Sequence, residues 1–207
     1  MNSDLSEDIR KSLAMLIGSN VYGNDLKTGY YVADSIFPLA INSTPTSSGM
    51  TFYDLQAAKQ LFAKEVDKLP NKKFPSDIKL YYYDNGIIKS IITDIVGHWQ
   101  NNLGAYVNIE AVTDIESFSS EITQPTYSMA IFPISADSTN IADYLKKLDT
   151  SYNGQDLGQL QTAILKGTHI IPIAFQNTTI AYSQQINKIY TELGNGYINF
   201  SFIIKNK

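Results

Sequence analysis

Two stretches in the first third of the chain carry apolar residues at helical spacing. Ser6 is a favourable N-cap for the first stretch, and Gly18 is a stop signal at its end. Asp54 caps the second stretch, which Pro70 ends. Between them, residues 19–50 are rich in Gly, Ser, Thr and Pro and lack a hydrophobic period, so we expect a long irregular excursion there.

The middle of the chain alternates patterns typical of strands with a pattern typical of a helix. Residues 78–83 are apolar and aromatic, and residues 106–110 form a second run of this kind. Between these runs, apolar residues recur every four positions from Ile87 to Trp99. Strand, helix and strand at this spacing predict a βαβ unit, in which the two strands are parallel and the crossover is right-handed.

The remaining segments continue this alternation with shorter signals. The proline within the last-but-one apolar run suits an edge strand or the start of a strand. No linker divides the chain, so residues 1–207 are predicted to form one α/β unit with a mixed, mostly parallel sheet flanked by helices. The patterns predict helices near 115–122, 141–148 and 156–165, and strands at 129–134, 170–175 and 196–204.

The composition is that of a globular protein and limits the possible partners. Hydrophobic residues make up 43% of the 207 positions and charged residues 17%, which argues against global disorder. The net charge is −4, and no Lys/Arg cluster is dense enough to neutralise a row of phosphates, so nucleic-acid binding is not expected. No apolar run has the length of a membrane span or the form of a signal peptide, so we expect any export signal upstream of Met1 or already removed.

Residues suited to catalysis or metal binding are scarce. The chain has no cysteine, which excludes disulfides, thiolate zinc sites and cysteine nucleophiles. Asp94 and His98 lie four apart on one predicted helix; this suits a shared metal or proton, but is more typical of a pair on the solvent side. His169 precedes a predicted strand, and serine-hydrolase, phosphate-loop and dinucleotide motifs are absent. We therefore predict no catalytic residue, metal or cofactor, with a hydrolase as the least favoured alternative.

Candidate ligand-binding residues follow two of the predicted strands. Ligands of open α/β sheets bind outside the carboxyl ends of the strands. Tyr83, Asp84 and Asn85 lie at one such end, and Ser135 and Asp137 lie at another. A carboxylate at this edge can take a ligand amine through charge-assisted hydrogen bonds. Two other interpretations stay open: packing of Tyr83 in the sheet, and capping of the next helix by Asp137.

Six segments, taken in order, match the sequence pattern of a known family. The most specific match is the run Tyr53-Asp54-Leu55-Gln56-Ala57-Ala58-Lys59-Gln60-Leu61. The others are Ile9 to Ala14, Thr28-Gly29-Tyr30 with Ala33 and Pro38, Trp99 with Leu103-Gly104 and Val107, Tyr127 to Ala130, and Ile170 to Ile173. Together they resemble the C-terminal lobe of the family-5 extracytoplasmic solute-binding proteins, the oligopeptide and dipeptide receptors of ABC importers.

The resemblance implies one lobe of a two-lobed, periplasmic-binding-protein-like receptor. Such a receptor encloses its ligand between the lobes and delivers it to an ABC permease in the membrane. It implies that the parent protein is an anchored lipoprotein at a bacterial cell surface, with an N-terminal lobe that this chain lacks. Ala136-Asp137 matches the turn whose Asp holds the peptide α-amino group in peptide-binding members, so the resemblance assigns that role to Asp137.

Several positions depart from the family pattern. Ile134 replaces a Trp that commonly precedes the Ala-Asp turn, and Ile131 stands where some oligopeptide binders have Arg. The stretch between Leu148 and Ile170 is much shorter than usual. These departures motivate an alternative function: a regulatory or sensor protein, or a degenerate surface protein, that reuses the binding-lobe fold.

Overall fold

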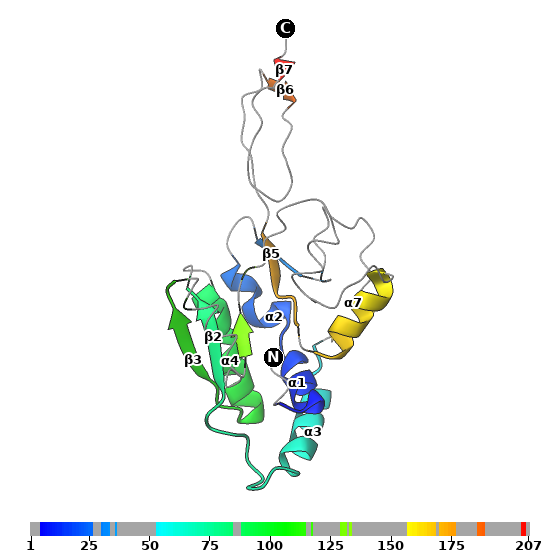
Figure 1. Cartoon of the computed structure of the whole chain (residues 1–207), viewed down its shortest axis with the longest axis vertical. Helices are drawn as coiled ribbons and strands as arrows, with labels where there is room; N and C mark the ends of the chain where they lie inside the picture. Colours follow the sequence, from blue (N-terminus) through cyan, green and yellow to red (C-terminus); the bar gives the residue numbers. More distant parts are fainter. Residues whose placement is uncertain are drawn as a thin grey trace.

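The computed structural model describes residues 5–26, 30–33, 36, 53–84, 88–114, 117, 129–131, 133, 157–168, 170–176, 186–188 and 204–205. Its helical segments are α1 (Glu7–Ala14), α2 (Ser19–Tyr22), the 3-10 turn η1 (Gly23–Asp25), α3 (Leu55–Val66), α4 (Ile88–Leu103) and α7 (Leu157–Lys166). Its strands are β1 (Tyr30–Val32), β2 (Lys79–Tyr83), β3 (Asn108–Val112), β4 (Met129–Ile131), β5 (Ala174–Gln176), β6 (Ile186–Lys188) and β7 (Ile204–Lys205) (Figure 1).

A three-stranded parallel sheet lies at the centre of the described fold. Its order is β3-β2-β4, with Leu80 opposite Ile109 on one side and Met129 on the other. The predicted βαβ unit is therefore confirmed as β2, α4 and β3. Strand β3 begins at Asn108, two residues later than predicted. Its first hydrogen bond to the neighbouring strand segment runs from Asn108 N to Ile78 O at 2.9 Å, and pairing starts there.

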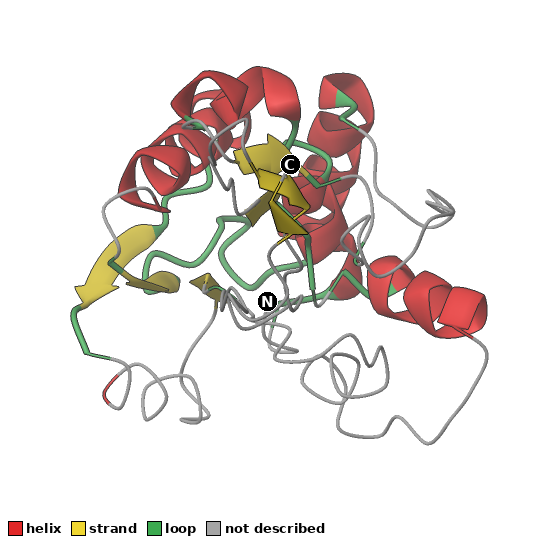
Figure 2. Ribbon diagram, turned by 90° about the horizontal axis from the view of Figure 1, so that it is seen from above, coloured by secondary structure: helices red, strands yellow, loops and turns green. Residues whose placement is uncertain are grey.

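The core lies between this sheet and the helices on one of its sides (Figure 2). Leu80 and Tyr82 point from β2 into the core, and the apolar stripe of α4 packs against them. Trp99, 1% exposed, donates from its indole Nε1 to the carbonyl oxygen of Leu13 at 2.9 Å. This bond joins α4 to α1, 86 residues away in sequence.

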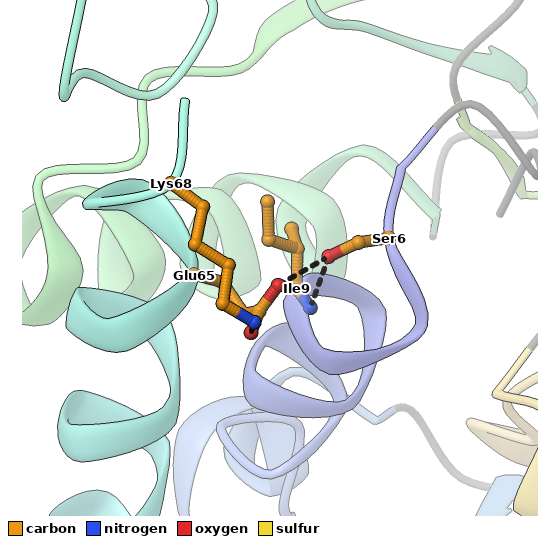
Figure 3. Close-up of polar contacts among 4 residues, drawn as sticks. All are labelled: Ser6, Ile9, Glu65 and Lys68. Carbon is orange, nitrogen blue, oxygen red and sulfur yellow. Dashed lines mark hydrogen bonds and ion pairs between the residues drawn. The ribbon is translucent and has the colours of Figure 1, made fainter. Parts of the chain in front are cut away.

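The N-terminal ends of α1 and α3 form as the sequence predicts. Ser6 accepts a hydrogen bond from Ile9 N at 3.2 Å, and Asp54 accepts one from Ala57 N at 2.9 Å. Ser6 also donates to Glu65 Oε2 at 3.4 Å, and Glu65 forms an ion pair with Lys68 (Figure 3). One side chain thus caps α1 and links it to the C-terminal end of α3.

The C-terminal ends of the same two helices come earlier than predicted. Helix α1 stops at Ala14 rather than at Gly18, and α3 stops at Val66 rather than at Pro70. In both cases the chain continues in tighter turns, with Leu16 N donating to Leu13 O and Leu69 N donating to Val66 O. The apolar stripes continue through these turns, so periodicity alone overestimated both helices.

The first part of the predicted irregular excursion contains short regular elements. Helix α2 and η1 precede β1, which pairs antiparallel with β5. The carbonyl of Ile173 anchors this two-stranded ribbon, since it accepts from Ala33 N at 3.0 Å and from the Tyr22 hydroxyl at 2.7 Å. Burial raises the pKa of Tyr22 to about 12. Pro172, which has no N–H to donate, lies just before this ribbon, in keeping with the predicted strand start at the proline.

Arg10, the only arginine, is buried and ties α1 to the end of α7. Its guanidinium donates to the Leu5 carbonyl and, from Nη2, to the Gly167 carbonyl at 3.1 Å. Helix α7 itself lies within one residue of its predicted bounds. The predicted helices at 115–122 (apart from Ser117) and 141–148, and the predicted strand at 196–204 apart from Ile204 in β7, lie outside the described residues.

We expect Trp99→Phe to lower the free energy of unfolding by about 2 kcal/mol, because it removes one of the two hydrogen bonds to the buried Leu13 carbonyl and leaves a cavity where the larger indole packed. Urea denaturation followed by circular dichroism measures the change, since the variant lacks the only tryptophan. Gln100→Ala, at the exposed neighbouring position, is the matched control and should change stability by less than about 0.5 kcal/mol. Equal effects of the two substitutions would contradict the role of the indole.

The pair of Glu65 and Lys68 predicts a loss of stability in acid. The hydrogen bond from Lys68 holds the pKa of Glu65 below its ordinary value of 4.5. The charged carboxylate therefore stabilises the fold above that pH, and the stabilisation is lost as the pH falls through the folded-state pKa. Denaturation of wild type and Glu65→Gln across this range should show a difference at neutral pH that disappears in acid. Asp67→Asn, at an exposed carboxyl next to the end of α3, should show no such convergence.

Candidate ligand-binding site

The carboxyl ends of the three parallel strands meet at one edge of the sheet, marked by the arrowheads in Figure 1. Tyr83, Val112 and Ile131 are the last residues of β2, β3 and β4. The pairing of β2 with β3 extends one residue further, because Asp84 N donates to Val112 O at 3.1 Å. This bond holds the half-buried Tyr83 and Asp84 at the edge, where ligands of open α/β sheets bind.

Asp114 adds a second carboxylate at this edge that the sequence reasoning missed. Its Oδ1 accepts a hydrogen bond from Ser117 N at 2.7 Å, which fixes the turn after β3. The predicted strand ended at residue 110, whereas β3 ends at Val112, two positions later and only two before Asp114. A usable signal was present, because an Asp directly before a predicted helix at 115–122 is a favourable N-cap.

The structure places two of the five predicted ligand-binding residues. Tyr83 and Asp84 are neighbours at the end of β2, at the edge where they were expected. Asn85, Ser135 and Asp137 lie outside the described residues, so their convergence on this edge stays a prediction.

The three consecutive tyrosines of β2 divide between the two faces of the sheet. Tyr82 is 3% exposed and packs in the core, so its role is structural. Tyr81 and Tyr83 take the opposite face with Lys79, because side chains alternate along a strand. Of these two, Tyr83 is the one at the carboxyl end and the more exposed.

An ion pair joins β2 and β3 on this second face. Lys79 Nζ lies 2.7 Å from Glu110 Oε1 and 5.8 Å from the ring centroid of Tyr81. The hydrogen bond with Glu110 raises the pKa of Lys79. Since Lys79 is the first residue of β2, this pair lies at the end of the strand away from Tyr83.

His98 contacts a tyrosine that precedes another helix. Its Nε2 lies 2.9 Å from the hydroxyl of Tyr53, which stands just before α3, and the two ring centroids are 5.8 Å apart. Partial burial lowers the pKa of His98. Within the described part of the chain, no group of three or more His, Cys, Asp or Glu side chains is arranged to hold a metal ion.

No protein-family model matches the chain, and no curated protein matches its sequence. Solved structures match its fold. The pheromone receptor PrgZ matches 98% of this chain and 45% of its own, with a TM-score of 0.69 and 13% identity. The substrate-binding domain of an oligopeptide ABC transporter from Bacillus anthracis matches 98% and 46%, with a TM-score of 0.64 and 13% identity. NikA from Staphylococcus aureus, in complex with Ni(L-His)2, matches 99% and 49%, with a TM-score of 0.57 and 14% identity.

The chain has the fold of the family-5 solute-binding proteins. It spans less than half the length of each of these three receptors, consistent with a single lobe of the family-5 fold. The expected fold class, a mixed and mostly parallel sheet flanked by helices, is therefore confirmed. Among the described residues, no helix is long and apolar enough to cross a membrane.

The contact with Tyr53 predicts a measurable property of His98. Because burial disfavours the imidazolium, the free energy of unfolding should fall as the pH drops below about 6.5. Tyr53→Ala should uncover the ring and return its pKa toward the ordinary value of 6.5, as measured by NMR titration. Tyr106→Ala, which removes a tyrosine that is 63% exposed, should leave this pKa unchanged. The same pKa in wild type and Tyr53→Ala would mean that other groups shield His98.

Proposed function

We propose that this chain is one lobe of a two-lobed receptor that binds a solute for ABC-type import, and that the solute is a peptide. The observation that carries the proposal is the family-5 fold together with a polar carboxyl edge of its parallel sheet. Among structures with this fold, PrgZ is a receptor that binds peptide, and OppA from Haemophilus influenzae forms a complex with the peptide RPPGFSPFR. These relatives are binding proteins rather than enzymes, which supports a function in capture and not in catalysis.

In this proposal, Asp137 anchors the α-amino group of the peptide. Tyr83, Asp84, Asn85 and Ser135 line the cleft side of the lobe. Strand β4 ends at Ile131, so Asp137 follows the edge by six residues and the chain keeps it within about 22 Å of the strand end. A carboxylate that bonds an ammonium group away from water contributes about 1.5–3 kcal/mol to binding.

The remaining parts of the receptor belong to a longer parent protein. The N-terminal lobe would close over the ligand, and the closed receptor would deliver it to an ABC permease. We place the parent at a bacterial cell surface, held to the membrane by an anchor outside this chain. No cofactor or nucleic acid takes part in this function.

Calorimetric titration of the full-length parent with short peptides tests the assignment of Asp137. Asp137→Asn should weaken binding by roughly 10- to 100-fold, the effect of one charge-assisted hydrogen bond. Asp77→Asn is the matched control, because Asp77 is an exposed carboxyl before the amino end of β2, and it should leave the affinity unchanged.

A second ligand separates a direct contact from a general effect of charge. Acetylation of the peptide amine should weaken binding to the wild-type receptor by a similar factor and have little further effect on Asp137→Asn. Equal losses on acetylation in both proteins would place the amine elsewhere. Failure of every peptide class to bind wild type would contradict the peptide proposal and favour the sensor or degenerate surface protein.

A further inference from the structure

Helix α3 and the turn after it carry a local excess of positive charge. The segment 59–73 contains Lys59, Lys64, Lys68, Lys72 and Lys73, against the two carboxylates Glu65 and Asp67. These five lysines are nearly a third of the 16 basic residues of the chain. Since the whole chain has a net charge of −4, the rest of the protein is more strongly acidic than the total indicates. We call residues 59–73 the lysine tip.

Most of the ammonium groups in the lysine tip are exposed and make no ion pair within the described part of the chain. All five lysines are exposed. Lys68 is paired with Glu65, whereas the other four have no ion-pair partner in the part of the chain that the structure describes. Lys72 and Lys73 lie beyond the end of α3 at Val66, so a role in capping the last helical turn does not account for them.

The turn that presents Lys72 and Lys73 is fixed by local contacts. Lys72 N donates to Leu69 O at 2.9 Å, and Lys72 itself has a φ of 50°, in the left-handed region. On the far side of the turn, Phe74 packs against Phe62 with ring centroids 5.5 Å apart. Lys72 and Lys73 are therefore held on a structured turn. Binding through them costs less conformational entropy than binding through a flexible terminal segment.

The lysine tip and the candidate ligand edge lie at opposite ends of the fold. In Figure 1 the turn after α3 is the lowest part of the chain, whereas the strand arrowheads of β2 and β3 point upward, away from it. The turn protrudes, and a protruding basic surface suits an extended anionic plane better than a small anion, which needs an enclosing site.

The residue types of the lysine tip favour a lipid bilayer over a protein surface as the anionic partner. A specific protein interface has an apolar or aromatic centre. The exposed large hydrophobic residues of the described chain are Tyr53, Tyr106 and Ile109, and none lies between 59 and 73. A lysine near an anionic bilayer needs no such centre, because each one raises the affinity about fivefold through charge alone.

We propose that the lysine tip docks this protein on an anionic lipid bilayer. The acidic remainder of the chain is repelled by the same surface, so the lysine tip is the part of the protein that meets the lipid. Binding is weak and depends on ionic strength, since exposed charges are screened within about 8 Å at physiological salt.

Sedimentation of the 207-residue chain with lipid vesicles tests the proposal. Vesicles that contain phosphatidylglycerol should bind the chain at low salt, and vesicles of phosphatidylcholine alone should not. Lys72→Gln/Lys73→Gln should lower the partition coefficient roughly 25-fold. Lys89→Gln/Lys166→Gln makes the same change of net charge at two exposed positions on α4 and α7, and should lower it less than twofold.

Three results would overturn the proposal. They are no binding of wild type to anionic vesicles, equal binding to neutral vesicles, and equal losses in the two double variants. Equal denaturation midpoints of both variants and wild type establish that a loss of binding is not a loss of folding. The proposal does not depend on the peptide function, because neither the vesicles nor the variants involve the ligand edge.

Discussion

The buried hydrogen bond between Trp99 and Leu13 is the contact on which the arrangement of helices and sheet depends. The Leu13 carbonyl lies in the last turn of α1, where regular i→i+4 bonding ends, and it also accepts from Leu16 N at 3.1 Å. The indole of α4 supplies a donor there, in a place that is closed to water. Because the other apolar residues of α4 pack on Leu80 and Tyr82, one helix holds α1 on one side and the sheet on the other. This hydrogen bond therefore fixes the position of α1 relative to α4, which apolar packing alone specifies less strictly.

The position of the candidate ligand edge follows from the parallel sheet that α4 supports. All three strands run in one direction, so their carboxyl ends, with Tyr83, Asp84 and Asp114, lie at one end of the sheet. The ion pair of Lys79 and Glu110 lies toward the other end of β2, and the lysine tip lies before that strand begins. The lysine tip and the carboxylates Asp84 and Asp114 therefore lie toward opposite ends of the sheet.

Short-range sequence patterns predicted most of the helices and strands correctly. The caps Ser6 and Asp54 bond amides three residues away, so a short stretch of sequence contains everything that they need. The same holds for the βαβ unit, because hydrophobic periodicity follows from which face of an element is buried. The ends of the elements were predicted less well. Strand β3 starts at Asn108 because Ile78 accepts its first hydrogen bond, and the sequence around residue 108 does not contain that information. The missed Asp114 is a consequence of that shift.

The sequence by itself determined the fold class, the two helix caps and the placement of Tyr83 and Asp84 at the end of a strand. Only the tertiary structure decided the partners of isolated polar groups. The guanidinium of Arg10 bonds a carbonyl 157 residues away, the Tyr22 hydroxyl bonds one 151 residues away, and His98 meets Tyr53 across 45 residues. Periodicity specifies which face of an element is buried, but it does not specify which other element covers that face. Hydrogen-bond partners across such a contact depend on distances of a few tenths of an ångström, and these are fixed only when the whole core has packed.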